Sequence, residues 1–179
     1  PLLRLLLPGQ PARVREALAW LARPGHHLLG RQDPRYPPLL RQAPQPPQAL
    51  FVDGDPDLLW LPAVAVVGSR GASAGGCDNA RRFSATLCRA GVAITSGLAA
   101  GIDASAHQAA LATPAGITLA VLGTGPDLAY PRRHADLRER IAAQGAVVSE
   151  HPPGTAARTW HFPARNRIIA GLSLGTLVV

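Results

Sequence analysis

Ala63-Val-Ala-Val-Val-Gly-Ser-Arg70 is the stretch that decides the fold. It runs apolar for one short segment and then breaks at small polar residues, and the same pattern recurs in Val92-Ala-Ile-Thr-Ser-Gly97 and Ile117-Thr-Leu-Ala-Val-Leu-Gly123. Runs this apolar are typical of parallel strands buried on both faces of a sheet. We therefore expect an open, doubly wound α/β sheet. Its strands are expected at 63–69, 92–97, 117–123, 146–150 and 175–179, and its helices at 76–90, 102–112, 135–144 and 164–172.

The residues before Ala63 predict smaller elements. Val14, Leu18 and Leu21 recur at helical spacing, and Pro24-Gly25 ends that segment. Short strands are expected at 26–31 and 49–53. Because no helix is expected between them, we predict that they form an antiparallel extension at the sheet edge. The proline-rich residues 36–47 predict an extended loop.

Composition points to a negatively charged partner. The chain has 179 residues and a formal net charge of +7, and all 18 basic residues are arginine. Such a charge favours a nucleic-acid or phosphate ligand. The longest leucine cluster, residues 2–7, is far shorter than the roughly 20 apolar residues that span a bilayer, so we expect no membrane segment and a cytoplasmic location. The apolar ending Leu177-Val-Val179 suggests a piece of a longer protein.

The turns that follow the strands carry the candidate ligand contacts. Carboxyl ends of parallel strands meet at one edge of the sheet, where such folds bind ligands. Glycine lets backbone approach a phosphate, a helix N-terminus offers unpaired N–H groups, and arginine forks onto phosphate oxygens. No dinucleotide fingerprint is present, so we expect no nicotinamide and no other cofactor. The candidate residues here are Gly68, Ser69, Arg70, Ser96, Gly97, Gly101, Gly123 and Gly125.

Phe162-Pro-Ala-Arg165-Asn166-Arg167 is the sharpest signal in the chain. Two arginines flank an asparagine beside an aromatic residue, and Arg158 lies shortly before them. An aromatic ring can stack an unpaired base, which is worth about 1–3 kcal/mol per base and tolerates any sequence. The alternative is that Phe162 belongs to the core and that the arginines bind helix carbonyls or a local acid such as Glu150. The clustering favours binding.

Two other patterns point to chemistry that we do not expect. Gly71-Ala-Ser73-Ala-Gly75 matches the nucleophile elbow of hydrolases, but three residues separate the strand from the serine, so Ser73 fits better as a helix N-cap. Asp103 and His107 share a helix face without a third ligand, and an acid in the first turn already favours the helix dipole. We therefore expect no catalytic residue and no metal.

Taken together, these motifs resemble the DNA-processing protein A family, also called DprA or Smf. The resemblance covers roughly Gly25 to the end, and the first 23 residues are similar to the tail of the family's small helical N-terminal domain. We accordingly predict a remnant of that domain at 1–24 and an extended Rossmann-like DNA-binding domain at 25–179. The motifs that carry it are 67–70, 96–107, 120–125, Tyr130-Pro131, Ser149-Glu150, 152–154 and 162–171.

The resemblance implies a single-stranded DNA-binding protein rather than an enzyme. In the family, such a protein protects incoming strands during natural transformation and helps to load the RecA recombinase, and the full-length protein forms a homodimer. By position, the pocket would include Gly68, Ser69 and Arg70 together with Phe162, Arg165, Asn166 and Arg167. The family's basic residue before the aromatic is missing here, and only Arg158 could replace it.

Two alternatives stay open at this point. Phosphoribohydrolases of related Rossmann-like folds cleave nucleoside monophosphates with the help of a carboxylate, and Glu150 and Asp103 are the acids in suitable positions. The second alternative is a structural or recombinase-binding module whose positive charge reflects amino-acid composition and not a DNA site. Such a module would show no preference for single-stranded over duplex DNA.

Overall fold

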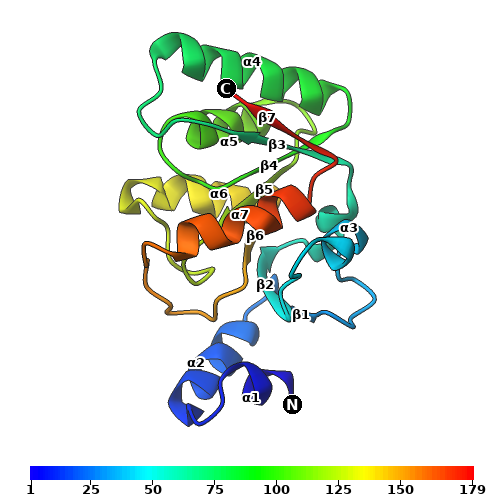
Figure 1. The fold of residues 1–179 in the computed structure, drawn as a ribbon, viewed down its shortest axis with the longest axis vertical. Coiled ribbons are helices and arrows are strands. Elements are labelled where there is room, and N and C mark those ends of the chain that lie inside the picture. Colours follow the sequence, from blue (N-terminus) through cyan, green and yellow to red (C-terminus); the bar gives the residue numbers. More distant parts are fainter.

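The computed structural model describes residues 1–179 and contains one seven-stranded sheet in the order β1-β2-β6-β5-β4-β3-β7 (Figure 1). Strands β3 to β7 all pair in parallel, whereas β1 and β2 join the edge beside β6 in antiparallel fashion. Both features confirm the predicted architecture. The strands are β1 (His26–Gly30), β2 (Ala49–Gly54), β3 (Ala63–Val67), β4 (Ala93–Ser96), β5 (Thr118–Leu122), β6 (Ala146–Ser149) and β7 (Gly175–Val178).

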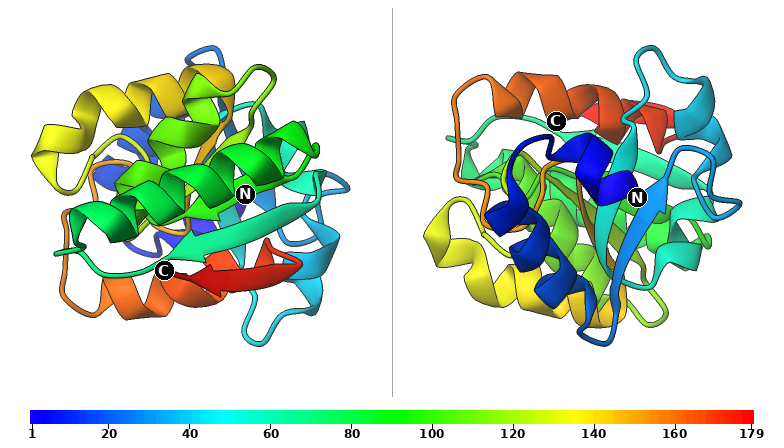
Figure 2. Two further views of the ribbon diagram at one scale, coloured as in Figure 1. Left: turned by 90° about the horizontal axis from the view of Figure 1, so that it is seen from above. Right: turned by 90° about the horizontal axis from the view of Figure 1, so that it is seen from below.

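Helices cover both faces of the parallel part of the sheet. Helices α4, α5 and α6 lie on one face and α7 lies on the other, which is the doubly wound arrangement (Figure 2). The chain returns through α7 to place β7 beside β3. The helices are α1 (Leu2–Leu6), α2 (Pro11–Leu21), α3 (Pro38–Gln42), α4 (Ala74–Arg89), α5 (Ile102–Ala112), α6 (Ala135–Gln144) and α7 (His161–Gly171), with 3₁₀ turns η1 (Pro56–Trp60) and η2 (Arg132–His134).

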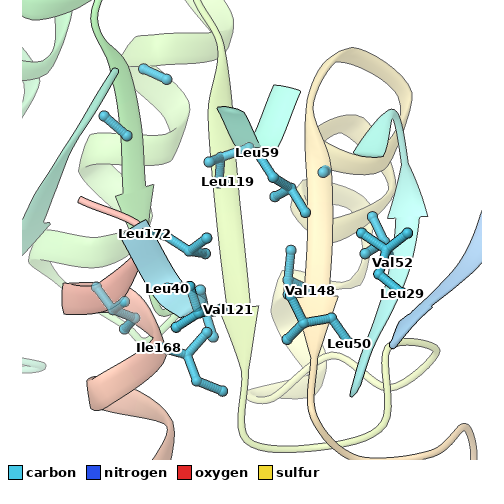
Figure 3. Close-up of a cluster of buried hydrophobic side chains, with 14 of the residues drawn as sticks. Leu29, Leu40, Leu50, Val52, Leu59, Leu119, Val121, Val148, Ile168 and Leu172 are labelled. Atoms are coloured by element: carbon cyan, nitrogen blue, oxygen red, sulfur yellow. The ribbon is translucent and has the colours of Figure 1, made fainter. Parts of the chain in front are cut away.

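The central strands are apolar on both faces because each face is covered. Val121 of β5 packs in the cluster that contains Ile168 of α7 and Leu172 at its C-terminal end (Figure 3), while its neighbour Leu122 packs with Ile141 of α6 on the opposite face. All five side chains are at most 2% exposed. Burying each one contributes about 1.5–3 kcal/mol, so this packing fixes the strand ends that form the site.

Most elements end within one or two residues of the sequence prediction, and two larger differences have a structural consequence. Residues Pro38–Gln42 form α3 rather than extended loop, because Pro38 is at the first helical position, where its missing N–H costs nothing, and Leu40 is buried beside α7. Helix α7 begins at His161 rather than at 164, so that Phe162 lies in its first turn. Ser73 caps α4 as predicted: its hydroxyl accepts a hydrogen bond from the Gly76 N–H at 3.1 Å.

The N-terminal helices α1 and α2 lie at the end of the molecule opposite α4 (Figure 1). Leu3, Ala17 and Trp20 from these helices pack on Phe51 of β2. The division of the chain into domains near residue 24 stays a prediction. No helix of the structure is both long enough and apolar enough to cross a membrane.

Candidate nucleic-acid interface

A cleft of about 440 Å³ opens at the carboxyl edge of the parallel strands. The turn after β3, the loop between β4 and α5 and the first turns of α7 meet there, although they lie far apart in the sequence. The doubly wound topology places a ligand site at this edge. Gly68 lines it, and the polar and aromatic side chains around it are those of Arg70, Asp103, Phe162, Arg165, Asn166 and Thr176.

Arg70 and Phe162 form the exposed centre of this cleft. The guanidinium carbon of Arg70 lies 5.4 Å from the centroid of the Phe162 ring. The Arg70 side chain is exposed and forms neither an ion pair nor a hydrogen bond, and Phe162 is only half-buried. The alternative of a phenyl ring in the core is therefore not what the structure contains. A cation held over an aromatic face is a stable arrangement that leaves the guanidinium N–H groups free to donate.

Arg165 is buried beneath that centre, at 5% exposure. Its guanidinium donates hydrogen bonds to the carbonyl oxygens of Gly97 and Val121, the latter at 2.5 Å, and it lies 3.9 Å from the Asp103 carboxylate. Burial lowers the pKa of Arg165 from its usual value, against the effect of Asp103. Because Nη1 of this buried group donates to both carbonyl groups, Arg165 joins β5, α7 and the loop after β4 into one unit.

Asp103 holds the same loop from the side of α5. Its carboxylate accepts hydrogen bonds from the N–H groups of Gly97 at 3.1 Å and Ala99 at 3.3 Å. Burial raises the pKa of this carboxyl group, although Arg165 and the two N–H groups favour its charged form. The acid that the sequence places in the first turn of α5 therefore shapes the floor of the cleft.

The glycines of the candidate set allow close packing around this floor. A Cβ on Gly97 would overlap the Arg165 guanidinium, and Gly101 has a φ of +77° and lies against the Ser69 carbonyl. The same holds for Gly68, Gly123 and Gly125, where an added Cβ would press on Ile102, Phe162 and the Pro152 carbonyl. Of the two serines, Ser96 is buried and donates to the Val66 carbonyl at 2.6 Å, whereas Ser69 is exposed and accepts from the Gly71 N–H at 3.1 Å.

Arg167 lies outside the lining of the cleft. Its guanidinium donates two hydrogen bonds to the Glu150 carboxylate, at 2.9 Å and 2.6 Å, and one to the Gln45 carbonyl at 3.0 Å. The hydrogen bonds to Glu150 raise the pKa of Arg167. The structure therefore does not bring Arg167 together with Arg70. Arg167 instead pairs with Glu150, as in the alternative interpretation of the sequence.

Arg158 and Trp160 form a second arginine–aromatic pair just before α7. The guanidinium carbon of Arg158 is 5.5 Å from the centroid of the Trp160 ring, which is 63% exposed. Tyr130 was part of a family motif in the sequence but was not among the candidate contacts, and its ring centroid lies 4.9 Å from that of Phe162. The signal that could have found it is an aromatic residue in the long loop after β5, the next strand along the same edge.

No group of three or more histidine, cysteine, aspartate or glutamate side chains is arranged to hold a metal ion. His107, which shares a helix face with Asp103, is fully buried and contacts the Thr118 hydroxyl through Nδ1 at 2.7 Å. The His107 ring thus lies between α5 and the sheet.

The chain matches the model of a known protein family over most of its length. The family model described as DNA recombination-mediator protein A matches residues 27–179. The chain belongs to this family. Similar curated proteins of the family include Protein Smf of Escherichia coli K12, 47% identical over 167 residues that cover 93% of this chain and 44% of that protein. DNA processing protein DprA of Bacillus subtilis 168 is 37% identical over 168 residues, which cover 93% of this chain and 56% of its own length. The chain thus spans about half of each relative.

Two solved structures of family members have the same fold. DNA processing protein A from Streptococcus pneumoniae superimposes with a TM-score of 0.84 and 40% identity, covering 94% of this chain and 57% of that one. The protein from Helicobacter pylori, whose structure concerns a single-stranded DNA binding mode, gives a TM-score of 0.74 and 28% identity and covers 80% of this chain and 65% of that one. The likeness confirms the family and the α/β architecture expected from the strand pattern.

Proposed function

We propose that this chain binds single-stranded DNA in the cleft at the carboxyl edge of the sheet, without chemistry on the strand. The observation that carries the proposal is the exposed, unpaired guanidinium of Arg70 over the half-buried ring of Phe162. Arginine forks onto phosphate oxygens, and a phenyl ring stacks any base. The pair therefore offers the two contacts that an unpaired nucleotide needs, with no preference for sequence.

The remaining candidate residues take different parts in this proposal. The backbone of Gly68 lines the cleft, and exposed Ser69 follows it at the approach to the phosphate. The Asn166 amide is exposed; its Oδ1 accepts a hydrogen bond from Arg165 Nε, and its NH₂ group can donate to DNA. Arg158 lies four residues before Phe162 in the sequence, and we propose that it contacts a strand long enough to extend beyond the cleft. Arg165 acts by positioning the cleft, since it is buried and its Nη1 donates to two carbonyl groups. In this proposal Arg167 does not contact DNA, because its guanidinium is paired with Glu150.

Relatives support this role. The matched family is a recombination-mediator family, and the H. pylori protein has a described single-stranded DNA binding mode. Protection of incoming strands, loading of RecA during natural transformation and a homodimer of the full-length protein extend the proposal to the whole protein, of which this chain spans about half. A cytoplasmic location remains a prediction that goes with this role.

The phosphoribohydrolase alternative gains no support from the geometry. Glu150 is paired with Arg167 outside the cleft. Asp103 is 4% exposed and accepts two backbone hydrogen bonds. Neither carboxylate is free to stabilise charge that develops on a ribose. Incubating the chain with nucleoside monophosphates and measuring free base tests this alternative directly.

A gel-shift comparison of single-stranded and duplex oligonucleotides at two salt concentrations tests the proposal. We expect a preference for single strands, and we expect Arg70→Ala to weaken binding to every single-stranded sequence. Losing one phosphate contact also lowers the slope of log affinity against log salt by about 0.7. Arg82→Ala is the matched control, because Arg82 is an exposed arginine on α4 outside the cleft. Equal affinity for duplex, or unchanged binding by Arg70→Ala, contradicts the proposal.

A further inference from the structure

We propose that Tyr130 and Arg133 form a second nucleotide subsite beside the Arg70–Phe162 pair, which takes the base and phosphate of the adjoining nucleotide. This inference rests on the proposed binding of single-stranded DNA. It assigns a site to the loop between β5 and α6, which forms no part of the main cleft.

A second cavity of about 210 Å³ adjoins the main cleft. Arg70 and Phe162 line both cavities, whereas Tyr130 and Arg133 line only the second. The two cavities are therefore neighbours that share Arg70 and Phe162, together with Ala99 and Arg165. The second is smaller than the sites that hold whole drug-sized ligands, which suits a single flat ring.

The chemistry of the second compartment matches that of the first. The Tyr130 side chain is 47% exposed, and its ring plane is inclined by 40° to that of Phe162. Arg133 is exposed and forms neither an ion pair nor a side-chain hydrogen bond. Tyr130 and Arg133 thus repeat, in the neighbouring cavity, the aromatic ring and unpaired guanidinium of Phe162 and Arg70. Such a repeat is what successive nucleotides of an unpaired strand require.

The compartment is held open by the protein itself. His134 contacts the Leu98 carbonyl through Nδ1 at 2.9 Å, which ties the segment after Tyr130 to the loop that begins at Gly97. Gly97 and Ala99 of that loop line the cavity together with the guanidinium of Arg165, which is itself held by the Gly97 carbonyl. A preformed compartment avoids the entropy cost of ordering a loop on binding.

Arg70 occupies the position of a shared contact. Because its side chain borders both compartments, it can donate to the phosphodiester that links a base on Phe162 to a base on Tyr130. Affinity should accordingly rise when a ligand is extended from one nucleotide to two. That rise should depend on Tyr130.

Calorimetric titration with thymidine monophosphate and with a thymidine dinucleotide tests the subsite. For the 179-residue chain we expect the dinucleotide to bind more tightly by roughly 5- to 150-fold, the equivalent of one stacked base. Tyr130→Ala should lose this gain while binding the mononucleotide as before, and Tyr130→Phe should keep it. Phe83→Ala is the matched control, because Phe83 is 48% exposed on α4 and lines neither cavity.

A pair of adjacent arginines tests the phosphate contact. Arg132 and Arg133 are both exposed, but only Arg133 lines the second cavity. Arg133→Ala should reduce the salt slope for a short single strand by about 0.7, whereas Arg132→Ala should leave it unchanged. Equal slopes for the two variants overturn the contact.

The outcomes separate this inference from the proposed function. A chain that binds no single-stranded DNA overturns both. A chain that binds single strands through Arg70, while Tyr130→Ala retains the full gain from one nucleotide to two, overturns only the second subsite.

Discussion

The carbonyl oxygen of Gly97 accepts a hydrogen bond from the buried guanidinium of Arg165, and the missing side chain of Gly97 leaves that guanidinium its space. Residues from the loop after β4 and from α7 are thereby locked together below the cleft. A binding surface built on such a rigid support loses little conformational entropy when it takes up a flexible strand.

Gly97→Ala should destabilise the fold. The added Cβ would overlap the Arg165 guanidinium, which is buried and cannot swing into solvent. Overpacking of this kind costs about 1–3 kcal/mol, which urea unfolding can measure. Gly75→Ala is the control, because its Cβ meets nothing within 4 Å and Gly75 lies in α4. That variant should be as stable as the parent or more stable.

Arg165→Ala should mainly lower the stability of the fold, whereas Arg70→Ala should mainly weaken DNA binding. Removing Arg165 leaves the Asp103 carboxylate buried without its cation, and breaking a buried pair in this way costs about 3–5 kcal/mol. Removing exposed Arg70 should change the free energy of unfolding by less than about 0.5 kcal/mol while weakening DNA binding. An Arg165→Ala protein as stable as the parent, defective only in binding, would show that Arg165 contacts the strand.

The sequence pattern predicted which strand ends form the candidate site, but it did not predict which arginines are buried or paired and which are free. Apolar runs that end in glycine identify buried parallel strands, and topology then brings their ends together. The acceptors of Arg165 lie 44 and 68 residues away, and the partner of Arg167 lies 17 residues away. The sequence offered carbonyl groups and Glu150 as possible partners but could not assign them to particular arginines, so three arginines that looked alike in the sequence have different surroundings in the structure.

Tertiary packing explains the other misses. The five prolines within residues 36–47 suggested an extended loop, but burial of Leu40 beside α7 stabilises a short helix there. Tyr130 lies in a long loop after β5, where no periodic pattern marks a side chain that meets Phe162. Both contacts depend on where α7 crosses the sheet, which the topology alone does not specify.

Arg167→Ala should leave affinity for single-stranded DNA close to that of the parent. Its guanidinium is occupied by Glu150 and the Gln45 carbonyl, outside the cleft. Because the ion pair is partly exposed to solvent, its loss should lower the free energy of unfolding by only about 1 kcal/mol. Fluorescence anisotropy with a labelled oligonucleotide measures the affinity. A loss as large as that of Arg70→Ala would place Arg167 on the DNA.

His107 should make stability depend on pH. The Thr118 hydroxyl donates its hydrogen to the Ile94 carbonyl, so it accepts from Nδ1 of His107, and Nε2 is left buried without a partner. Burial lowers the pKa of His107 from 6.5 to about 3, and the positive charges of Arg165 and His134 act in the same direction. The folded protein therefore keeps this ring neutral in the range where the unfolded chain takes up a proton.

The stabilisation from neutral His107 is complete above pH 6.5 and is lost as the pH falls from there towards 3. His107→Gln keeps a polar side chain but cannot titrate. Urea unfolding of both proteins between pH 8 and pH 4 measures the effect. The difference in free energy of unfolding should be constant above pH 6.5, and below it the parent should lose about 1.4 kcal/mol per pH unit relative to the variant. Parallel curves down to pH 4 would mean that His107 is protonated inside the fold or is exposed to solvent.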